Sequence, residues 1–194
     1  LKDPAIAAKF DANGDGTADL AGCVPGWGCE RVIEHHLTEY GLRDTVTHNQ
    51  GEYNALMADT IARLQNGQPV LYFTWTPYWV SGALVPGKDV EWLDVPYTSL
   101  PDGVEANTEF GGKNLGFAVD NMYILATDKF LADNPAAAAF LASVKIDIND
   151  VSAQNKLMAD GAASSEDIDK HVADWIAAHQ ADFDAWVAAA AAAK

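Results

Sequence analysis

Basic residues are scarce in this sequence. The 194-residue chain has 12 Lys and Arg against 28 Asp and Glu, which gives a net charge of −16 with histidine neutral. Nucleic acids and anionic membrane surfaces are bound through clusters of Lys and Arg. The composition therefore excludes both as expected partners.

Long apolar runs are also lacking. A transmembrane helix needs about 20 consecutive apolar residues, and the longest alanine run, residues 188–193, is short and terminal. We therefore expect no direct membrane insertion. The chain begins at Leu1-Lys2-Asp3-Pro4, without Met or a basic leader, so we expect it to be processed, trimmed or part of a longer chain. Hydrophobic residues make up 49%, enough for a packed core.

The chain has only two cysteines, Cys23 and Cys29. Such a pair can be a disulfide in an oxidising compartment, half of a metal site or a redox pair. The spacing is not C-x-x-C and two sulfurs make a poor zinc site, so the disulfide is favoured. A free Cys29 thiol ahead of a helix would instead be an activated nucleophile. A thiol-dependent enzyme using Cys29 is therefore the alternative function, although no other nucleophile or nucleotide-binding motif is present.

The apolar pattern predicts an α/β fold in the first half of the chain. Helical spacing indicates helices near residues 32–40 and 52–65, each followed by a glycine. The apolar run at 69–75 is typical of a buried strand, and residues 90–95 and 122–127 are predicted as further strands. The glycine-rich first thirty residues are expected to hold little regular structure.

Alanine becomes frequent after residue 128, and the pattern there predicts helices. We expect them at about 128–133, 136–144, 150–160, 165–180 and 182–192, after a loop over residues 100–116. The composition changes between residues 94 and 118. This predicts two domains, residues 1–95 and residues 96–194.

A tryptophan framed by glycines precedes the first predicted helix, in Gly26-Trp27-Gly28-Cys29. Free N–H groups at a helix N-terminus attract anions, and glycine lets a ligand approach the backbone. One interpretation is an anion site with an aromatic wall. The other is a tryptophan that simply covers the core.

Aromatic side chains are concentrated at the end of the predicted strand, where five of residues 72–79 are aromatic. Ligands of open α/β sheets bind beyond the carboxyl ends of strands. Aromatic faces attract quaternary ammonium groups, which donate no ordinary hydrogen bond. We predict that Tyr72 and Phe73 are structural and that Trp75 is the best ligand candidate.

The segment from Asp11 to Asp19 matches the front half of a calcium loop. Asp11, Asn13, Asp15 and Asp19 occupy positions 1, 3, 5 and 9, with glycine at position 6. Position 12 is Gly22, so the bidentate glutamate is absent. Weak calcium binding and a metal-free Asx-turn loop are both open.

Several segments together resemble the periplasmic glycine betaine/proline betaine-binding proteins of ProU-type ABC transporters. They are PGWGCE at 25–30, THNQG at 47–51, TWTPYWV at 74–80 and PGKDV at 86–90. The resemblance covers essentially the whole chain. It implies a periplasmic, non-enzymatic solute-binding protein with the type II periplasmic-binding-protein fold of two α/β lobes. Such a protein captures a betaine and delivers it to a membrane permease, and it requires no cofactor.

The resemblance also implies roles for individual residues. In that family three tryptophans enclose the quaternary ammonium, and backbone N–H groups and a histidine hold the carboxylate. By position, Trp27 and Trp75 are similar to two of the tryptophans, Gly28 and Cys29 to the N–H donors, and Cys23 and Cys29 to a disulfide pair. The third tryptophan and the histidine precede the position matching Leu1. The N-terminal part of one lobe is therefore expected to be missing, and betaine binding by this chain is expected to be weak.

Overall fold

The computed structural model describes residues 1–193 and divides them into two compact units. Unit 1 consists of residues 1–75 and 84–119, and unit 2 of residues 76–83 and 120–193. Over the described range, no helix has both the length and the apolar character needed to cross a membrane. The assignment of residues 1–95 and 96–194 to two lobes of a binding protein stays a prediction.

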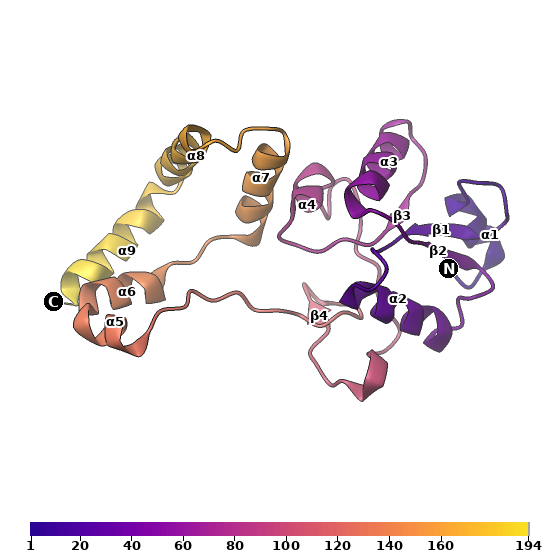
Figure 1. Cartoon of the computed structure of the whole chain (residues 1–194), viewed down its shortest axis with the longest axis horizontal. Coiled ribbons are helices and arrows are strands. Elements are labelled where there is room, and N and C mark those ends of the chain that lie inside the picture. The colour runs from indigo at the N-terminus through magenta and orange to yellow at the C-terminus, as the bar shows by residue number, and fades with distance from the viewer. Residues whose placement is uncertain (194) are drawn as a thin grey trace. The chain divides into compact units, whose positions relative to one another are not determined.

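Unit 1 is built on a parallel three-stranded sheet. Its strands are β1 (Ala18–Ala21), β2 (Val46–Asn49) and β3 (Leu71–Tyr72), in the order β2-β1-β3. Helix α2 (Gly28–Glu39) connects β1 to β2, and α3 (Tyr53–Gln65) connects β2 to β3. The two helices cover opposite faces of the sheet (Figure 1). This is the α/β layering that the sequence predicts.

The core of unit 1 lies between this sheet and α2. In the central strand, Leu20 is in register with His48 of β2 and Leu71 of β3. The buried side chains at the centre of the core are Ala7, Ala18, Cys23, Ile33, Leu37 and Val46. Phe73 and Phe117 pack against them from the edge. The core therefore includes a cysteine of the loop that leads into α2.

The remaining elements of unit 1 are short. They are α1 (Pro4–Ala7), the 3₁₀ turns Ala8–Phe10 and Pro101–Gly103, and the antiparallel hairpin of β4 (Glu109–Phe110) and β5 (Lys113–Asn114). The turn of the hairpin is Gly111-Gly112, where both residues have positive φ. This two-residue turn suits the twist of a hairpin.

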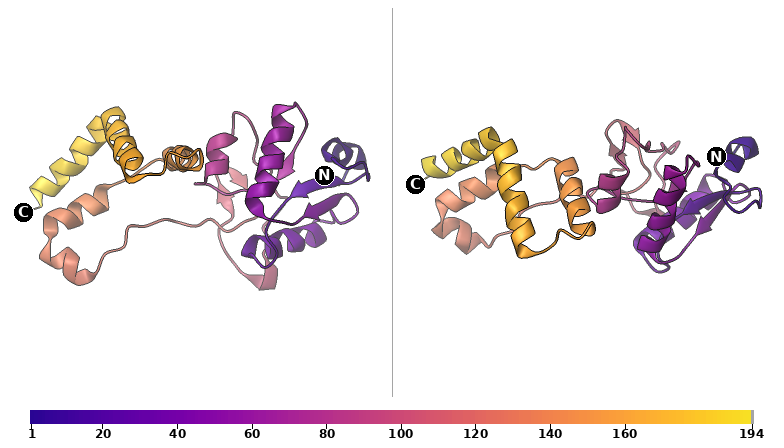
Figure 2. Two further views of the ribbon diagram at one scale, coloured as in Figure 1. Left: turned by 45° about the horizontal axis from the view of Figure 1, so that its top comes forward. Right: turned by 90° about the horizontal axis from the view of Figure 1, so that it is seen from above.

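All the regular secondary structure in the described residues of unit 2 is helical. Its helices are α4 (Trp79–Ala83), α5 (Asp128–Asp133), α6 (Pro135–Ser143), α7 (Ile148–Ala159), α8 (Ser165–Ala178) and α9 (Gln180–Ala192). Thr127 and Asp147 cap α5 and α7, and Ser164 opens α8 with a reciprocal capping box. Helix α4 packs on α7, and α6 packs on α9. Figure 2 shows the salmon-coloured α6 beside the yellow α9 from two further directions.

The predicted helices are confirmed, whereas several strand predictions are wrong. Strand β1 lies within the first thirty residues, and the β4–β5 hairpin lies within the predicted loop. Residues 90–95 form no regular strand, and residues 122–127 are extended without pairing. A helix closes its hydrogen bonds locally, whereas a strand exists only where a partner strand is present.

Candidate functional site

The topology of the sheet marks one position as a binding edge. Strand β1 is the central strand, with β2 on one side and β3 on the other. The connection through α2 therefore leads to one side of β1, and the connection through α3 crosses to the other side. Ligands of open α/β sheets bind beyond the carboxyl ends of the strands at such a switch point. Residues 22–27 follow β1 there, and residues 73–75 follow β3. These two segments carry the tryptophans singled out in the sequence.

Three aromatic rings meet at this edge. The ring centroids of Trp27 and Trp75 are 6.2 Å apart with planes inclined at 64°. Tyr53, the first residue of α3, lies 5.0 Å from Trp75 and 6.2 Å from Trp27. Trp27 is 43% exposed, whereas Tyr53 is 2% exposed. An exposed indole therefore stands beside a half-buried one, over a buried tyrosine.

Tyr53 is the member of this cluster that the sequence analysis did not single out. Its hydroxyl donates toward the Phe73 carbonyl at 3.1 Å and the Thr74 hydroxyl at 3.0 Å. These contacts tie the start of α3 to the segment that carries Trp75. The apolar spacing of α3 shows that Tyr53 points inward, but no local pattern shows which side chains it meets.

The N-terminus of α2 lies at the same edge as the rings. Trp27 is the N-cap residue, and its side chain makes no capping hydrogen bond. Gly28 and Cys29 form the start of the helix, so their N–H groups have no partner inside it. A Cβ built on Gly28 would meet nothing within 4 Å, so the backbone there is open. The N–H groups predicted to bind an anion therefore lie next to Trp27, which was predicted to form the aromatic wall.

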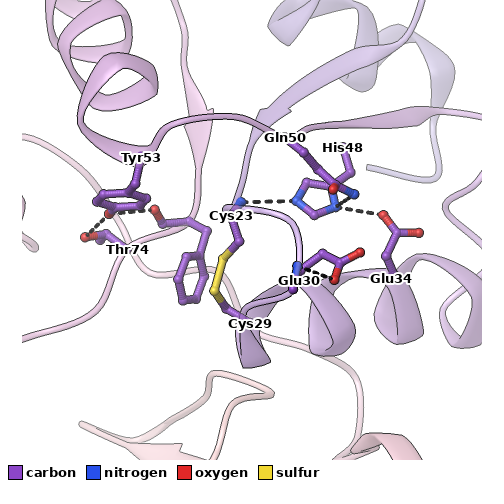
Figure 3. The surroundings of a disulfide bond; sticks show 10 residues. Cys23, Cys29, Glu30, Glu34, His48, Gln50, Tyr53 and Thr74 are labelled. Atoms are coloured by element: carbon purple, nitrogen blue, oxygen red, sulfur yellow. Dashed lines mark hydrogen bonds and ion pairs between the residues drawn. A yellow bond between two sulfur atoms is a disulfide. The ribbon is translucent and has the colours of Figure 1, made fainter.

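A disulfide joins Cys23 to Cys29, as predicted. The Sγ atoms are 2.03 Å apart and the Cα atoms 6.2 Å apart. Cys23 is fully buried in the core, so the bond anchors the first turn of α2 to the sheet. Figure 3 shows this bond with His48 on one side and Tyr53 on the other. Because neither cysteine is free, Cys29 has no thiol for the alternative nucleophilic role.

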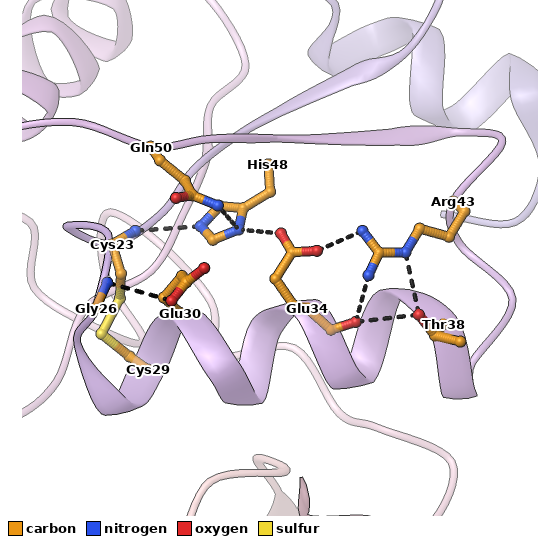
Figure 4. A network of polar contacts seen from close by, with 9 residues as sticks. All are labelled: Cys23, Gly26, Cys29, Glu30, Glu34, Thr38, Arg43, His48 and Gln50. Carbon is orange, nitrogen blue, oxygen red and sulfur yellow. Dashed lines mark hydrogen bonds and ion pairs between the residues drawn. A yellow bond between two sulfur atoms is a disulfide. The ribbon is translucent and has the colours of Figure 1, made fainter.

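A buried histidine adds a second tie between the loop and α2 (Figure 4). The Cys23 N–H donates to His48 Nε2 at 3.2 Å, and His48 Nδ1 lies 2.7 Å from Glu34 Oε1. Since Nε2 accepts, the ring proton is on Nδ1 and is donated to the carboxylate. Sequence analysis assigned His48 no role, because its partners come from two other elements.

Glu34 is held in its charged form by this network. Burial alone would raise the pKa of Glu34, but hydrogen bonds from His48 and Arg43, together with the Arg43 charge, hold that pKa below its usual value. Arg43 also donates to the Glu34 backbone carbonyl at 2.8 Å. The relay from Arg43 through Glu34 and His48 therefore positions the segment that leads to Trp27.

The Asp11–Asp19 loop forms Asx-type turns in the structure. Asp11 accepts from the N–H groups of Gly14 at 2.6 Å and Gly16 at 2.8 Å. These bonds, that of Gly16 first, lower the pKa of Asp11. The hydroxyl and N–H of Thr17 do the same for the pKa of Asp15. Both carboxylates thus accept hydrogen bonds from N–H and hydroxyl groups of their own loop.

Asp19 belongs to β1 rather than to the loop, and it is buried. It accepts from Ala12 N–H at 2.6 Å and from the side-chain amides of Asn13 and Asn49. Among the side chains of residues 1–193, no three His, Cys, Asp or Glu come close enough together to hold a metal ion. Weak calcium binding by Asp11, Asn13, Asp15 and Asp19 and a metal-free loop both stay predictions. A rise in melting temperature with millimolar calcium would favour binding, and an unchanged melting temperature would favour the metal-free loop.

Two further tryptophans pack together in unit 2. Trp175 and Trp186 are stacked, with centroids 6.0 Å apart, and the Trp175 indole donates to Asp150 at 3.1 Å. His179 stacks on Trp175 at 4.2 Å. Trp175 thereby links α8 to α7 through Asp150 and to α9 through Trp186.

Comparison with known proteins finds one family over most of the chain. The substrate-binding domain of the ABC-type glycine betaine transport system matches residues 1–178. The chain is 56% identical over 196 residues to the glycine betaine-binding periplasmic protein OusX of Dickeya dadantii. It is 55% and 51% identical to the glycine betaine/proline betaine-binding periplasmic proteins of Escherichia coli and Salmonella typhimurium. All of the chain is covered, and it spans 59% of the length of each relative.

Proposed function

Since this chain belongs to the family of substrate-binding domains of ABC-type glycine betaine transport systems, we propose that it binds glycine betaine or a related betaine in the periplasm for delivery to a membrane permease. The periplasmic relatives at 51–56% identity support this proposal. The family is one of substrate-binding domains, and the structure offers no free thiol for an enzymatic alternative.

The observation that carries the proposal is the meeting of Trp27, Trp75 and the α2 N-terminus at one sheet edge. A betaine has a cation without hydrogen-bond donors and, a few bonds away, a carboxylate. Indole faces attract such a cation, and free helix N–H groups attract an anion. Trp27 and Trp75 would contact the ammonium group, and the N–H groups of Gly28 and Cys29 would bind the carboxylate.

The disulfide and the hydrogen bonds behind this edge would preorganise the site before the ligand binds. The disulfide fixes Cys29, and the bond from Cys23 to His48 fixes the loop before Trp27. Affinity rises when binding does not have to order the residues that make contact. The disulfide and the histidine relay would thus serve binding rather than chemistry.

The proposal includes the two-lobe, type II architecture of periplasmic binding proteins. The parallel α/β sheet of unit 1 supports it, as does the family match over residues 1–178. Residues 1–95 would then belong to the lobe that carries Trp27 and Trp75. The remaining residues would belong to the other lobe.

The test is a titration followed by the indole N–H signals in NMR. Glycine betaine should shift the signals of Trp27 and Trp75 and leave that of Trp175 unchanged. Choline lacks the carboxylate, and 3,3-dimethylbutanoate has the same shape without the positive charge. Both should bind more weakly than glycine betaine, because each lacks one of the two recognised groups.

Variants separate binding from stability. Trp75→Ala should remove the response to glycine betaine. Trp175→Ala should lower the melting temperature, since Trp175 is hydrogen-bonded to Asp150, but should keep the response. Equal losses in both variants, or no indole shift with any ligand, would contradict the proposed site.

A further inference from the structure

The segment before α5 is apolar and exposed to an unusual degree. Every residue from 120 to 130 is exposed. Met122 is 68% exposed, Tyr123 79%, Ile124 52% and Leu125 92%. Large apolar side chains scattered singly on a surface need no explanation, but a contiguous patch marks an interaction site.

The backbone of this segment is also unpaired. Residues 121–127 are extended, belong to no helix or strand, and contain no charge, proline or glycine. In the described part of the chain, the N–H and C=O groups of residues 121–126 make no hydrogen bond to protein. A β-prone, uncharged segment with a free backbone is a template for pairing with another strand.

We propose that residues 121–127 of two copies of this chain pair as antiparallel strands about a two-fold axis at Ile124. In this register Tyr123 of one copy lies opposite Leu125 of the other, and Met122 lies opposite Ala126. Directly opposed aromatic and aliphatic side chains stabilise a strand pair. A two-fold axis lets the same patch serve on both copies. The two most exposed side chains, Tyr123 and Leu125, thereby form two equivalent pairs, one on each side of the axis.

The exposed area is close to what a specific interface requires. If each of these four large side chains can bury about 150–200 Å² and is exposed by 52–92%, together they offer roughly 500 Å² in each copy. Two copies would bury about 1,000 Å², the lower limit for a specific interface. We therefore expect a weak dimer whose population rises with protein concentration.

Charge should make this dimer sensitive to salt. The same register places Asp120 opposite Asp128, and each copy has a net charge of −16. Like charges opposite each other destabilise a strand pair, and salt screens them. Association should therefore strengthen as salt increases, in contrast to association through opposite charges.

Sedimentation equilibrium from about 10 to 500 µM protein, at low salt and at about 0.5 M salt, measures this association. We expect dimer, with more dimer at high salt. Leu125→Lys should weaken association about tenfold or more, because a charged side chain blocks a strand edge. Val172→Lys is the matched control, since Val172 is 53% exposed on α8 and lies outside the segment. A chain that stays monomeric throughout, or equal effects of both variants, would overturn the proposal.

Cross-linking tests the register itself. The native cysteines are bonded to each other, so an introduced cysteine is the single free thiol. Ile124→Cys should give a disulfide-linked dimer on mild oxidation, because opposed Cα atoms lie about 5 Å apart. Met122→Cys should not, because the two Met122 positions would lie about 14 Å apart, four residues along the strands. Equal cross-linking of both variants, or none, would refute the pairing.

Discussion

At the residue scale, the loop before α2 depends on a glycine, Gly22, at a position with no room for a side chain. Gly22 follows β1 and precedes Cys23, and its backbone passes directly under the His48 ring. A Cβ built on Gly22 would lie 1.9 Å from His48 Nε2, the atom that accepts from Cys23. Only glycine leaves room for this bond. His48 can therefore hold the loop only because position 22 carries no side chain.

Replacing Gly22 by alanine should be destabilising by about 1–3 kcal/mol, as expected for an overpacked site. The new methyl group would push the His48 ring away from Cys23 and Glu34. Gly28→Ala is the matched control, because nothing lies within 4 Å of its Cβ position. Urea unfolding should show the loss for Gly22→Ala alone. Similar stability of the two variants would mean that His48 moves aside without cost.

His36 is the residue that should govern stability in mildly acidic solution. It is 7% exposed, Nε2 lies 3.0 Å from the Ser99 carbonyl, and the ring packs on Tyr40 and Phe117. Burial, with a smaller contribution from His35, lowers the pKa of His36 below its usual 6.5. The unfolded chain therefore takes up the proton first. The contribution of the neutral His36 ring to the free energy of unfolding is therefore fully present above about pH 6.5. It is lost as the pH falls toward the lowered pKa.

We predict that His36→Gln reduces this loss, because glutamine can still donate to Ser99 but does not titrate. The free energy of unfolding should be measured between about pH 8 and pH 5, above the range in which Asp and Glu titrate. The wild-type chain should lose stability on the acid side, and the variant should lose less. Parallel curves for the two proteins would show that other groups cause the acid sensitivity.

At the scale of elements, close specific contacts hold helices of both units in addition to their apolar packing. Helix α2 is held by the disulfide, by the Glu34–His48 pair and by the Gly26 N–H bonded to Glu30. In unit 2, α4 and α7 approach each other at Gly82. A Cβ at Gly82 would lie 2.6 Å from the Ser152 carbonyl oxygen and 2.9 Å from Lys156 Cβ. Glycine allows the two helix backbones to touch.

Gly82→Ala should therefore destabilise the α4–α7 pair, although alanine in a helix normally adds about 1 kcal/mol of stability relative to glycine. Hydrogen exchange should become faster in α4 and α7 while α2 and α3 keep their protection. Gly51→Ala is the control, since its Cβ would meet only Leu56 at 3.8 Å, an ordinary contact. Unchanged exchange in α7 would show that the two helices accommodate the added methyl group without loss of stability.

At the scale of the whole molecule, the proposed site offers few contacts to its ligand. Micromolar affinity needs about 8 kcal/mol. A desolvated cation–π contact supplies about 2 kcal/mol and an exposed one about 0.5–1 kcal/mol. Trp27 is 43% exposed, so its contact falls in the weaker class. Two rings and two N–H groups do not reach 8 kcal/mol once the entropy of association is subtracted.

We thus predict that this chain binds glycine betaine only in the millimolar range, measured by NMR or calorimetric titration. Because the ligand is a neutral zwitterion, the affinity should change little with salt, despite the net charge of −16. Dimerisation through residues 121–127 should respond to salt, so the two equilibria can be told apart. Micromolar binding by a monomer would contradict this prediction.

The sequence by itself determined the features that depend on near neighbours in the chain. Apolar spacing predicted α2, α3 and the helices from α5 to α9, because each helical hydrogen bond joins residues only four positions apart. The adjacency of Trp27 to a helix N-terminus is likewise local, and so is the short span between Cys23 and Cys29. These signals sufficed to propose both halves of the candidate site.

The tertiary structure alone decided which distant residues meet. Strand β1, with the sequence Ala-Asp-Leu-Ala, has little strand propensity and exists because β2 and β3 pair with it on both sides. Tyr53 joins Trp27 and Trp75, and His48 joins Glu34 to Cys23, across elements that the chain order does not place together. Residues 122–127 have the stronger strand pattern but no partner strand within the described chain. Pairing between distant segments depends on the whole fold, and so no local pattern determines it.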